Sequence, residues 1–504
     1  SVGFLLNKKN NMSLIKKIKN SKTNVINPLK ISVNYKKNKI KKLVAINEIS
    51  LLRQSKQTAM MSLKLNNKNL IKKLIGDGVL VSIIDKEFDT DHTQLNDAGK
   101  ITTYNTVLNT VYRSHGTAVA GIIAADAGDA GLIGVAPKAD LHLTDWGQSG
   151  QTHLGWATLG TDAARVAGAK VQNNSWGINA SLIDDHIATK NSNGWTSAQT
   201  FSYVWYGNTN SSNVTEVTNY ITALNNFQTA GGIVVFSNSN TAANDNAEIT
   251  AALPELFPEL AEAFIGVINI DVTGAAGSET FTRKSAPCGD AAEYCLGADG
   301  HGIVTLDGAN GYTYHVDQET DESALYINTG TSFAAPQVTG AAAILYEAFP
   351  NHTAEMIVDR LLASANNSTS LIGSHTGAVT FGNGVQHGYN ANYGHGLMDV
   401  YAALNPITSS SYSQSIFPNG GNLGDPLNNG QNGGQSLALT TLSVSQSFGD
   451  SISTALSDEV NYFYDALNGG FAYKMDGHVI PQSNTKPVIS LEAEMSKMKS
   501  ASAL

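Results

Sequence analysis

The sequence has very few cysteines and no long uninterrupted run of apolar residues. Only Cys288 and Cys295 occur among its 504 residues, which excludes a framework of several disulfides and a metal site built from cysteines alone. No apolar run reaches the roughly 20 residues that cross a bilayer, so we predict no transmembrane helix. Hydrophobic residues still make up 42% of the chain, enough for a sizeable core.

Acidic residues are nearly absent from the N-terminal segment, where residues 1–75 hold 18 Lys or Arg and one acid, Glu48. This segment carries +17, whereas residues 76–504 carry −27. Such an asymmetry indicates an appended segment with a separate role. We expect residues 1–75 to be a basic, poorly ordered leader or pro-segment, and we expect no nucleic-acid partner. No signal peptide is recognisable, because no apolar run follows Lys8 and Lys9.

A polar Gly-Thr-Ser at residues 330–332 runs directly into an Ala-rich apolar segment, residues 334–346. This pattern predicts a serine in the first turn of a buried helix, where unpaired backbone N–H groups and the positive helix end stabilise an anion. Ser332 is therefore a candidate nucleophile with an oxyanion pocket beside it. The alternative is an ordinary helix cap, which requires neither Gly330 nor Pro336.

Two upstream side chains can supply the base and the carboxylate that a nucleophilic serine needs. His115 opens a second apolar segment rich in small residues. Asp85 ends a stretch of β-branched residues, 79–84, that predicts a buried parallel strand. Functional groups of open α/β sheets gather at the carboxyl ends of such strands. An ordinary cap or turn is the alternative for Asp85, but its place before His115 and Ser332 favours a catalytic role.

The chain order Asp, His, Ser resembles that of the subtilisin-like serine peptidases, the subtilases or peptidase S8 family. The resemblance covers about residues 76–405. Three blocks carry it, at residues 85–95, 114–117 and 330–336. It implies an α/β fold, with a parallel β-sheet covered by helices on both faces, and a serine endopeptidase that forms an acyl-enzyme. The implied roles are nucleophile, general base and orienting acid for Ser332, His115 and Asp85.

The resemblance also implies an oxyanion hole and a substrate-binding segment. Asn240 follows the predicted strand 232–237 and would donate to the oxyanion together with the backbone N–H of Ser332; Asn238 is the competing choice. The segment that pairs with an extended peptide and walls the first specificity pocket matches Ser175, Trp176 and Gly177. A buried tryptophan that closes a strand is the alternative for this segment.

Two departures from the family pattern bear on activity. Asp85 is followed by Lys86 and Glu87 instead of Ser/Thr-Gly, and Ser239 stands where the family has glycine. A side chain at either place strains the turn if the glycine had positive φ. The alternative function is therefore that of a binding or adhesion module, which keeps the subtilase fold but is catalytically impaired.

The two cysteines lie in one short loop that contains a glycine. Cys288 and Cys295 can close as a disulfide, with two free thiols as the alternative. This block resembles the one in autotransporter-type subtilases of Gram-negative bacteria, which implies a secreted or cell-surface protein. We expect a monomer that acts on proteins or peptides and meets a membrane only through a translocator that is missing from this chain or separate from it.

No cofactor is required for the expected chemistry. Structural calcium is considered for the Asp/Asn/Gly-rich residues 126–131 and for Asp89 with Asp91. Surface turns explain these residues equally well, so no metal site is assigned.

The chain divides into a basic segment, a catalytic domain at 76–405, a Gly/Asn/Ser-rich linker at 406–436 and an extension of unknown role at 437–504. Strands are predicted at 79–84, 139–143, 170–175, 232–237 and 264–270. Helices are predicted at 115–125, 155–167, 216–230, 331–348 and 353–364. Inserted loops that shape specificity are expected at 178–215, 241–262 and 299–327.

Overall fold

The computed structural model describes most of the central part of the chain and short pieces of its C-terminal part. The described residues are 74–105, 114–126, 132–274, 278–312, 328–405, 407, 442–443, 460–479 and 488–493. The predicted leader, residues 1–75, and the predicted linker, residues 406–436, therefore lie almost wholly outside them.

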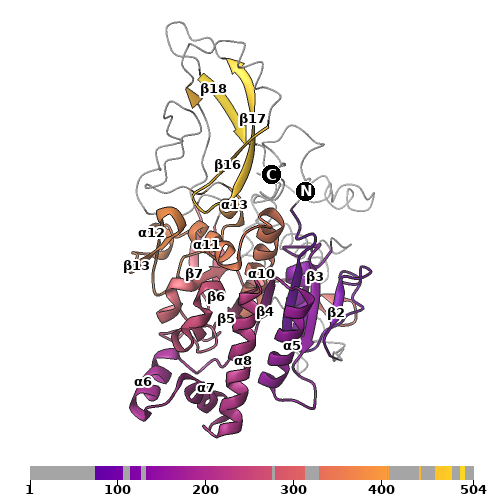
Figure 1. Ribbon diagram of the computed structural model, residues 1–504, viewed down its shortest axis with the longest axis vertical. Helices are drawn as coiled ribbons and strands as arrows, with labels where there is room; N and C mark the ends of the chain where they lie inside the picture. Colours follow the sequence, from indigo (N-terminus) through magenta and orange to yellow (C-terminus); the bar gives the residue numbers. More distant parts are fainter. Residues whose placement is uncertain are drawn as a thin grey trace, which may run out of the picture.

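The body is built on one large sheet with parallel strands in its middle (Figure 1). In spatial order the strands are β2 (Ile101–Thr103), β3 (Asp140–Asp145), β1 (Leu80–Asp85), β4 (Val171–Asn174), β5 (Ile233–Ser237), β6 (Phe264–Thr273) and β7 (Thr280–Arg283). A further strand, β8 (Cys295–Ala298), pairs in parallel with β6. The sheet is mostly parallel, as predicted, and it is mixed at this edge because β7 runs antiparallel to β6.

Helices cover both faces of the sheet, as predicted. On one face lie α4 (His115–Ala124), α10 (Thr331–Ala348) and α11 (Ala354–Ser364). On the other face lie α5 (His153–Ala167) and α8 (Ser211–Thr229). Residues of β1 are buried on both faces of the sheet, which explains its β-branched sequence. Val81 and Ile83 pack in the apolar core beside α4 and α10, and Ile84 packs in the apolar core beside α5 and α8.

The segment 178–215, predicted to be an inserted loop, is largely helical instead. It contains α6 (Ile183–Asn193), α7 (Ser197–Tyr206) and the start of α8. A capping box opens α7, since Gln199 N–H donates to the Thr196 hydroxyl and Thr196 N–H donates to the Gln199 side chain. This local signal outweighs the polar, Asn- and Ser-rich composition that favoured a loop.

The other two predicted loops also contain regular structure. Residues 241–262 include α9 (Leu253–Leu256) and most of η2 (Pro258–Ala263). Residues 299–327 include the short strands β9 (His301–Ile303), β10 (Leu306–Asp307) and β11 (Gly311–Tyr312), and residues 313–327 lie outside the described part.

The remaining elements complete the body and begin the C-terminal extension. In the body they are η3 (Gly289–Tyr294), β12 (Asn328–Thr329), α12 (Thr369–Ile372), β13 (Gly377–Phe381), η4 (Gly382–Gly384), β14 (Val385–Tyr389) and α13 (Val400–Ala403). In the extension they are β15 (Leu442–Ser443), β16 (Val460–Tyr464), β17 (Gly470–Val479) and β18 (Val488–Ala493).

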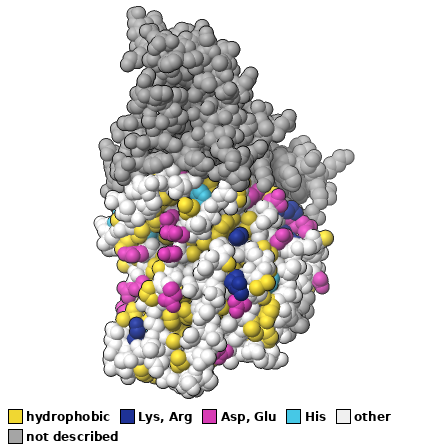
Figure 2. Space-filling model, viewed as in Figure 1, with side chains coloured by type: hydrophobic (Ala, Val, Ile, Leu, Met, Phe, Trp, Pro, Cys, Tyr) yellow, Lys and Arg dark blue, Asp and Glu magenta, His cyan; other side chains and the backbone are white. Residues whose placement is uncertain are grey.

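The described surface agrees with the acidic balance of residues 76–504. On the face shown in Figure 2, acidic side chains are spread over the described part and basic ones are few. Among the described helices, none is both long and apolar enough to span a bilayer.

Candidate active site

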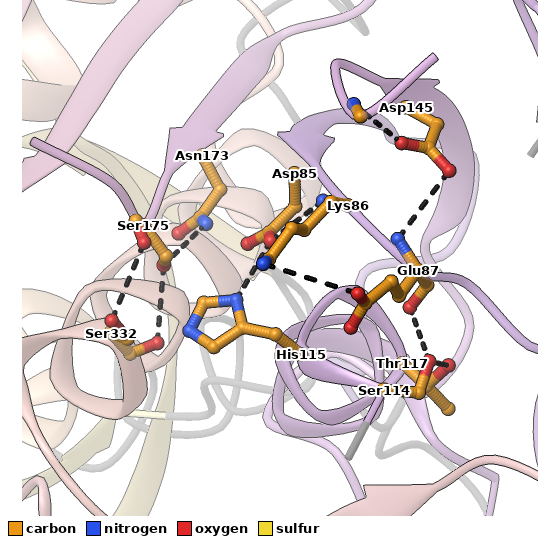
Figure 3. A network of polar contacts seen from close by, with 11 residues as sticks. Asp85, Lys86, Glu87, Ser114, His115, Thr117, Asp145, Asn173, Ser175 and Ser332 are labelled. Atoms are coloured by element: carbon orange, nitrogen blue, oxygen red, sulfur yellow. Dashed lines mark hydrogen bonds and ion pairs between the residues drawn. The ribbon is translucent and has the colours of Figure 1, made fainter. Parts of the chain in front are cut away.

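Asp85 and His115 meet where the carboxyl end of β1 faces the first turn of α4 (Figure 3). His115 Nδ1 lies 2.7 Å from Asp85 Oδ1. The helix is held against the strand by Gly116 N–H, which donates to the Lys86 carbonyl at 2.8 Å. A Cβ atom at Gly116 would lie 2.6 Å from the Phe88 ring, so this close approach requires glycine.

The surroundings of the pair favour a basic imidazole. Asp85 is 1% exposed, and its Oδ1 also accepts the Lys86 N–H at 2.8 Å. Burial lowers the pKa of His115, but the charge and the hydrogen bond of Asp85 outweigh it, so the pKa lies above its usual value. Because Asp85 receives the proton-bearing Nδ1, the other ring nitrogen is free to accept a proton.

Ser332 is the second residue of α10, as the Gly-Thr-Ser pattern predicted. In Figure 3 the imidazole of His115 lies between Asp85 and Ser332, and its ring is 5.8 Å from that of Phe333. The Ser332 hydroxyl donates to the Ser175 carbonyl at 3.3 Å and not to His115. A change of the Ser332 rotamer is therefore needed before the hydroxyl can reach the imidazole.

A second hydrogen bond joins Ser332 to the segment after β4, and Pro336 is the reason that the Ser332 carbonyl is available for it. An α-helical residue four positions after Ser332 would donate its N–H to the Ser332 carbonyl, but proline has no N–H. The Ser175 hydroxyl donates to this carbonyl instead, at 3.1 Å. Asn173 in turn donates to the Ser175 hydroxyl at 2.9 Å and accepts from Thr339 at 3.0 Å.

The side chain of Asn240, and not that of Asn238, contacts the loop before the nucleophile, although the Asn238 carbonyl also accepts from the Thr331 hydroxyl at 2.5 Å. Asn240 Oδ1 accepts the backbone N–H of Thr331 at 2.8 Å and its hydroxyl at 3.0 Å. The Thr331 N–H can only donate, so these bonds fix the carbonyl side of the amide and leave Nδ2 as the donor that remains. Asn238 is 4% exposed, and its Nδ2 donates to the Pro287 carbonyl at 2.8 Å.

The two departures from the family pattern have different local effects. Ser239 does not adopt positive φ, so a side chain there does not strain the loop. Glu87 does adopt the left-handed conformation, with φ of 64°. Its carbonyl accepts from the Ser114 hydroxyl at the start of α4, and its carboxylate lies 3.9 Å from Lys86 Nζ. The Asp85–His115 contact is present in spite of this strained residue.

Trp176 belongs to an aromatic cluster and is half-buried. Its ring lies 5.0 Å from Phe236 of β5, 5.7 Å from Trp205 of α7 and 6.2 Å from Tyr220 of α8. The sequence alone could not separate a pocket wall from a buried tryptophan, and the structure places Trp176 in contact with the inserted helix α7.

Glu248 is a buried carboxylate beside this segment that the sequence reasoning missed. It is 0% exposed and accepts from the Ile178 N–H at 2.7 Å and from the Thr250 hydroxyl at 2.6 Å. Burial raises its pKa to about 7. A Cβ atom at Gly177 would lie 2.7 Å from its Oε2, so the segment predicted to bind substrate rests directly on this carboxylate.

The candidate calcium ligands have structural contacts. Asp89 Oδ2 accepts the Asn310 N–H at 3.2 Å, and Asp89 Oδ1 accepts the Asp91 N–H at 3.2 Å. Within the part of the chain that the structure describes, no group of three potential metal-ligating side chains is found. Residues 127–131 lie outside that part.

Cys288 and Cys295 form a disulfide, with their Cα atoms 5.9 Å apart. The bridge packs beneath the turn at Gly394, where an added Cβ would lie 2.7 Å from Cys288 Sγ and 2.1 Å from the Cys295 carbonyl. Gly394 has φ of 55°, so both its conformation and its surroundings require glycine.

The mostly parallel sheet with helices on both faces defines an α/β protein, and Asp85, His115 and Ser332 lie close to one another within it. The sequence model of the Subtilase family, Peptidase_S8, matches residues 76–396, and the chain belongs to this family. The members of the family are serine peptidases, which gives the class of chemistry.

The chain is similar to named proteins over part of its length. An extracellular serine protease from Serratia marcescens is 26% identical over 323 residues, a match that covers 56% of this chain and 29% of that relative. The solved structure of fervidolysin from Fervidobacterium pennivorans, a keratinolytic enzyme related to subtilisin, is 23% identical, with a TM-score of 0.43 over 68% of this chain and 45% of that one.

A shorter match points to a different kind of protein. A stretch of 84 residues, 16% of the chain, is 37% identical to part of an NAD kinase from Xanthomonas oryzae pv. oryzae and covers 33% of that protein. Because this match covers so small a share of both chains, it assigns no activity to this protein.

Proposed function

We propose that this protein is a serine endopeptidase that cleaves proteins through an acyl-enzyme. The single observation that carries the proposal is the 2.7 Å contact between His115 Nδ1 and Asp85 Oδ1, with the other edge of the imidazole turned toward Ser332. Family membership supplies the class of reaction, and the residues supply a nucleophile, a base and an orienting acid.

The mechanism begins when the Ser332 hydroxyl leaves the Ser175 carbonyl and turns toward His115. The hydroxyl oxygen attacks the peptide carbonyl while His115 accepts the hydroxyl proton. The backbone N–H of Ser332 and Nδ2 of Asn240 stabilise the oxyanion. His115 then donates its proton to the leaving amine. A water molecule hydrolyses the acyl-enzyme with the same base, and this step regenerates Ser332.

The substrate is an extended peptide bound along Ser175–Gly177. This segment continues β4 beyond the sheet, and it joins the nucleophile through the Ser175–Ser332 hydrogen bonds. An extended chain added beside it would bring its scissile bond to Ser332.

We further propose that the protein works outside the cytoplasm, on the cell surface or in the medium. The disulfide suits an oxidising compartment, and the Serratia relative is described as extracellular. Sequencing the N-terminus of protein recovered from the medium tests this proposal, since protein confined to the cytoplasm with both thiols reduced contradicts it.

The activity is tested with a fluorophosphonate probe on purified, folded protein. We expect one labelled serine, Ser332, and no label in Ser332→Ala. The matched control is Ser192→Ala, which removes an exposed hydroxyl of α6 and leaves labelling unchanged. Folded protein that takes up no probe contradicts the proposal and supports the alternative of a non-catalytic binding or adhesion module.

A further inference from the structure

A turn from the C-terminal extension is buried in the body of the protein. This turn, Asp465–Gly469, joins β16 to β17, which lie at the top of Figure 1. Asp465, Ala466 and Leu467 are 2%, 0% and 3% exposed. Ala466 and Leu467 belong to the same apolar core as α10 and α11. The extension therefore contributes to the core of the unit that carries Ser332.

A buried ion pair joins this turn to α11. Nη2 of Arg360 donates to both carboxylate oxygens of Asp465, at 2.7 and 2.6 Å, and both side chains are 0% exposed. Nη1 of Arg360 donates to the carbonyl of Ala403 at 3.0 Å, and the guanidinium carbon lies 4.3 Å from the centre of the Phe349 ring. The body thus forms a shaped cationic site with an aromatic wall.

The turn is built to fit this site. Asp465 Oδ1 also accepts the N–H groups of Leu467 at 3.0 Å and Gly469 at 2.7 Å, so the carboxylate shapes its own loop. Its Oδ2 accepts the Ile407 N–H at 2.8 Å, and Ala466 N–H donates to the Ile407 carbonyl at 2.8 Å.

A side chain of the body completes the attachment. Asn383 Nδ2 donates to the Ala466 carbonyl at 2.8 Å. Three separate places therefore hold the turn: Arg360 through an ion pair, Ile407 through backbone hydrogen bonds and Asn383 through its side-chain amide.

A buried guanidinium without its carboxylate is strongly unfavourable, because its lost hydration is then uncompensated. Arg360 lies within the family-matched region, 76–396, whereas Asp465 lies 105 residues further along the chain. The partner that neutralises Arg360 is thus supplied from beyond the stretch that the family model matches.

We propose that the catalytic unit has a binding site for the Asp465–Gly469 turn, and that this site anchors the C-terminal extension without a covalent link. A chain cut between residues 408 and 459 keeps its extension bound. The occupant of the site is this segment of the same chain, and Asp465 is its specificity determinant.

The experiment uses the full chain with Ser332→Ala, so that the protein does not cut itself, and with the recognition site of a specific protease inserted in residues 419–436. After cleavage, the body is captured through an N-terminal tag, and retention of the extension is measured over time. We expect the extension to stay bound, and we expect Asp465→Asn to release it roughly 10²- to 10³-fold faster.

The matched control is Asp458→Asn, which removes the same charge from the same extension and leaves retention unchanged. Two further experiments test the proposal if the Asp465→Asn protein does not fold. A synthetic peptide of residues 460–470 should displace the extension from cut wild-type protein, and the same peptide with Asn at 465 should not. The double variant Arg360→Met, Asp465→Leu should retain the extension better than Asp465→Asn, because an apolar pair leaves no buried charge.

Either of two results overturns the proposal. One is immediate loss of the extension from cut wild-type protein. The other is equal retention in Asp465→Asn and Asp458→Asn, or equal displacement by the two peptides.

Discussion

Glu87 holds a backbone conformation that is costly for any residue with a Cβ atom. Its φ of 64° costs about 1–2 kcal/mol relative to glycine. Glycine also raises the entropy of the unfolded chain, and this offsets about half of the stability gained by relieving the strain. We predict that Glu87→Gly raises the free energy of unfolding by about 0.5–1 kcal/mol, measured by urea titration in Ser332→Ala protein.

Glu87→Ala is the control for this prediction, because it removes the carboxylate and keeps the Cβ atom. It should bring no gain in stability. A Glu87→Gly protein less stable than the Glu87→Ala protein would show that this turn is not strained.

His115 determines the acid side of the pH profile. Catalysis needs the neutral imidazole, and the pKa of His115 lies above 6.5, so kcat/KM should fall as the pH falls through this raised pKa. Asp85→Asn removes the attraction that raises the pKa and leaves the burial that lowers it. We predict that the acid limb then moves to lower pH and that kcat drops about 10⁴-fold.

Asp97→Asn is the matched control, because Asp97 is an exposed carboxylate paired with Lys138. Its pH profile should coincide with that of the wild-type protein. An acid limb that does not move in Asp85→Asn would assign the titration to another group.

At the scale of elements, α10 depends on a hydrogen bond from outside the helix. Pro336 leaves the Ser332 carbonyl without a helical donor, and the Ser175 hydroxyl replaces it. We predict that Ser175→Ala lowers the free energy of unfolding by about 1 kcal/mol in Ser332→Ala protein. Pro336→Ala supplies an N–H, so it should restore much of this loss when combined with Ser175→Ala.

A double-mutant cycle tests whether the effects of Ser175→Ala and Pro336→Ala on the free energy of unfolding depend on each other. Pro336→Ala should have a smaller effect when Ser175 is present, because the Ser332 carbonyl then already has a donor. Additive effects of the two substitutions would contradict the link between Pro336 and Ser175.

Local patterns explain how much could be predicted from the sequence. The strand ending at Asp85 and the helices opening at His115 and Ser332 each have a hydrophobic period and an adjacent polar residue, so their elements were predicted within a few residues. The capping box of α7 was equally local, but it lies in a polar stretch whose composition was weighed more heavily.

Contacts between distant residues explain what could not be predicted. Thr339 bonds to Asn173 across 166 positions, and Glu248 supports the segment at Ile178 from 70 positions away. Nothing next to these residues in the sequence marks the contact. The same holds for Asp465, whose partner Arg360 is defined only once α11 has packed.

For the whole molecule, the disulfide stabilises the loop that packs against the turn at Gly394. Cys288 and Cys295 close a short loop with a sequence separation of 7. We predict that Cys288→Ala with Cys295→Ala lowers the free energy of unfolding by about 2–3 kcal/mol. Urea titration of Ser332→Ala protein with and without reductant measures it.

The double alanine variant provides its own control. Reductant should destabilise protein with the disulfide and leave the double variant unchanged. If reductant leaves both equally stable, the bridge does not stabilise the fold.

The outer strands of the large sheet are short, with three residues in β2 and four in each of β7 and β8. β7 also runs against the direction of its neighbour, and Arg283 ends it. Short outer strands offer few free backbone groups to a second molecule. Copies of this protein at high concentration therefore find little template for fibril growth along these margins of the large sheet.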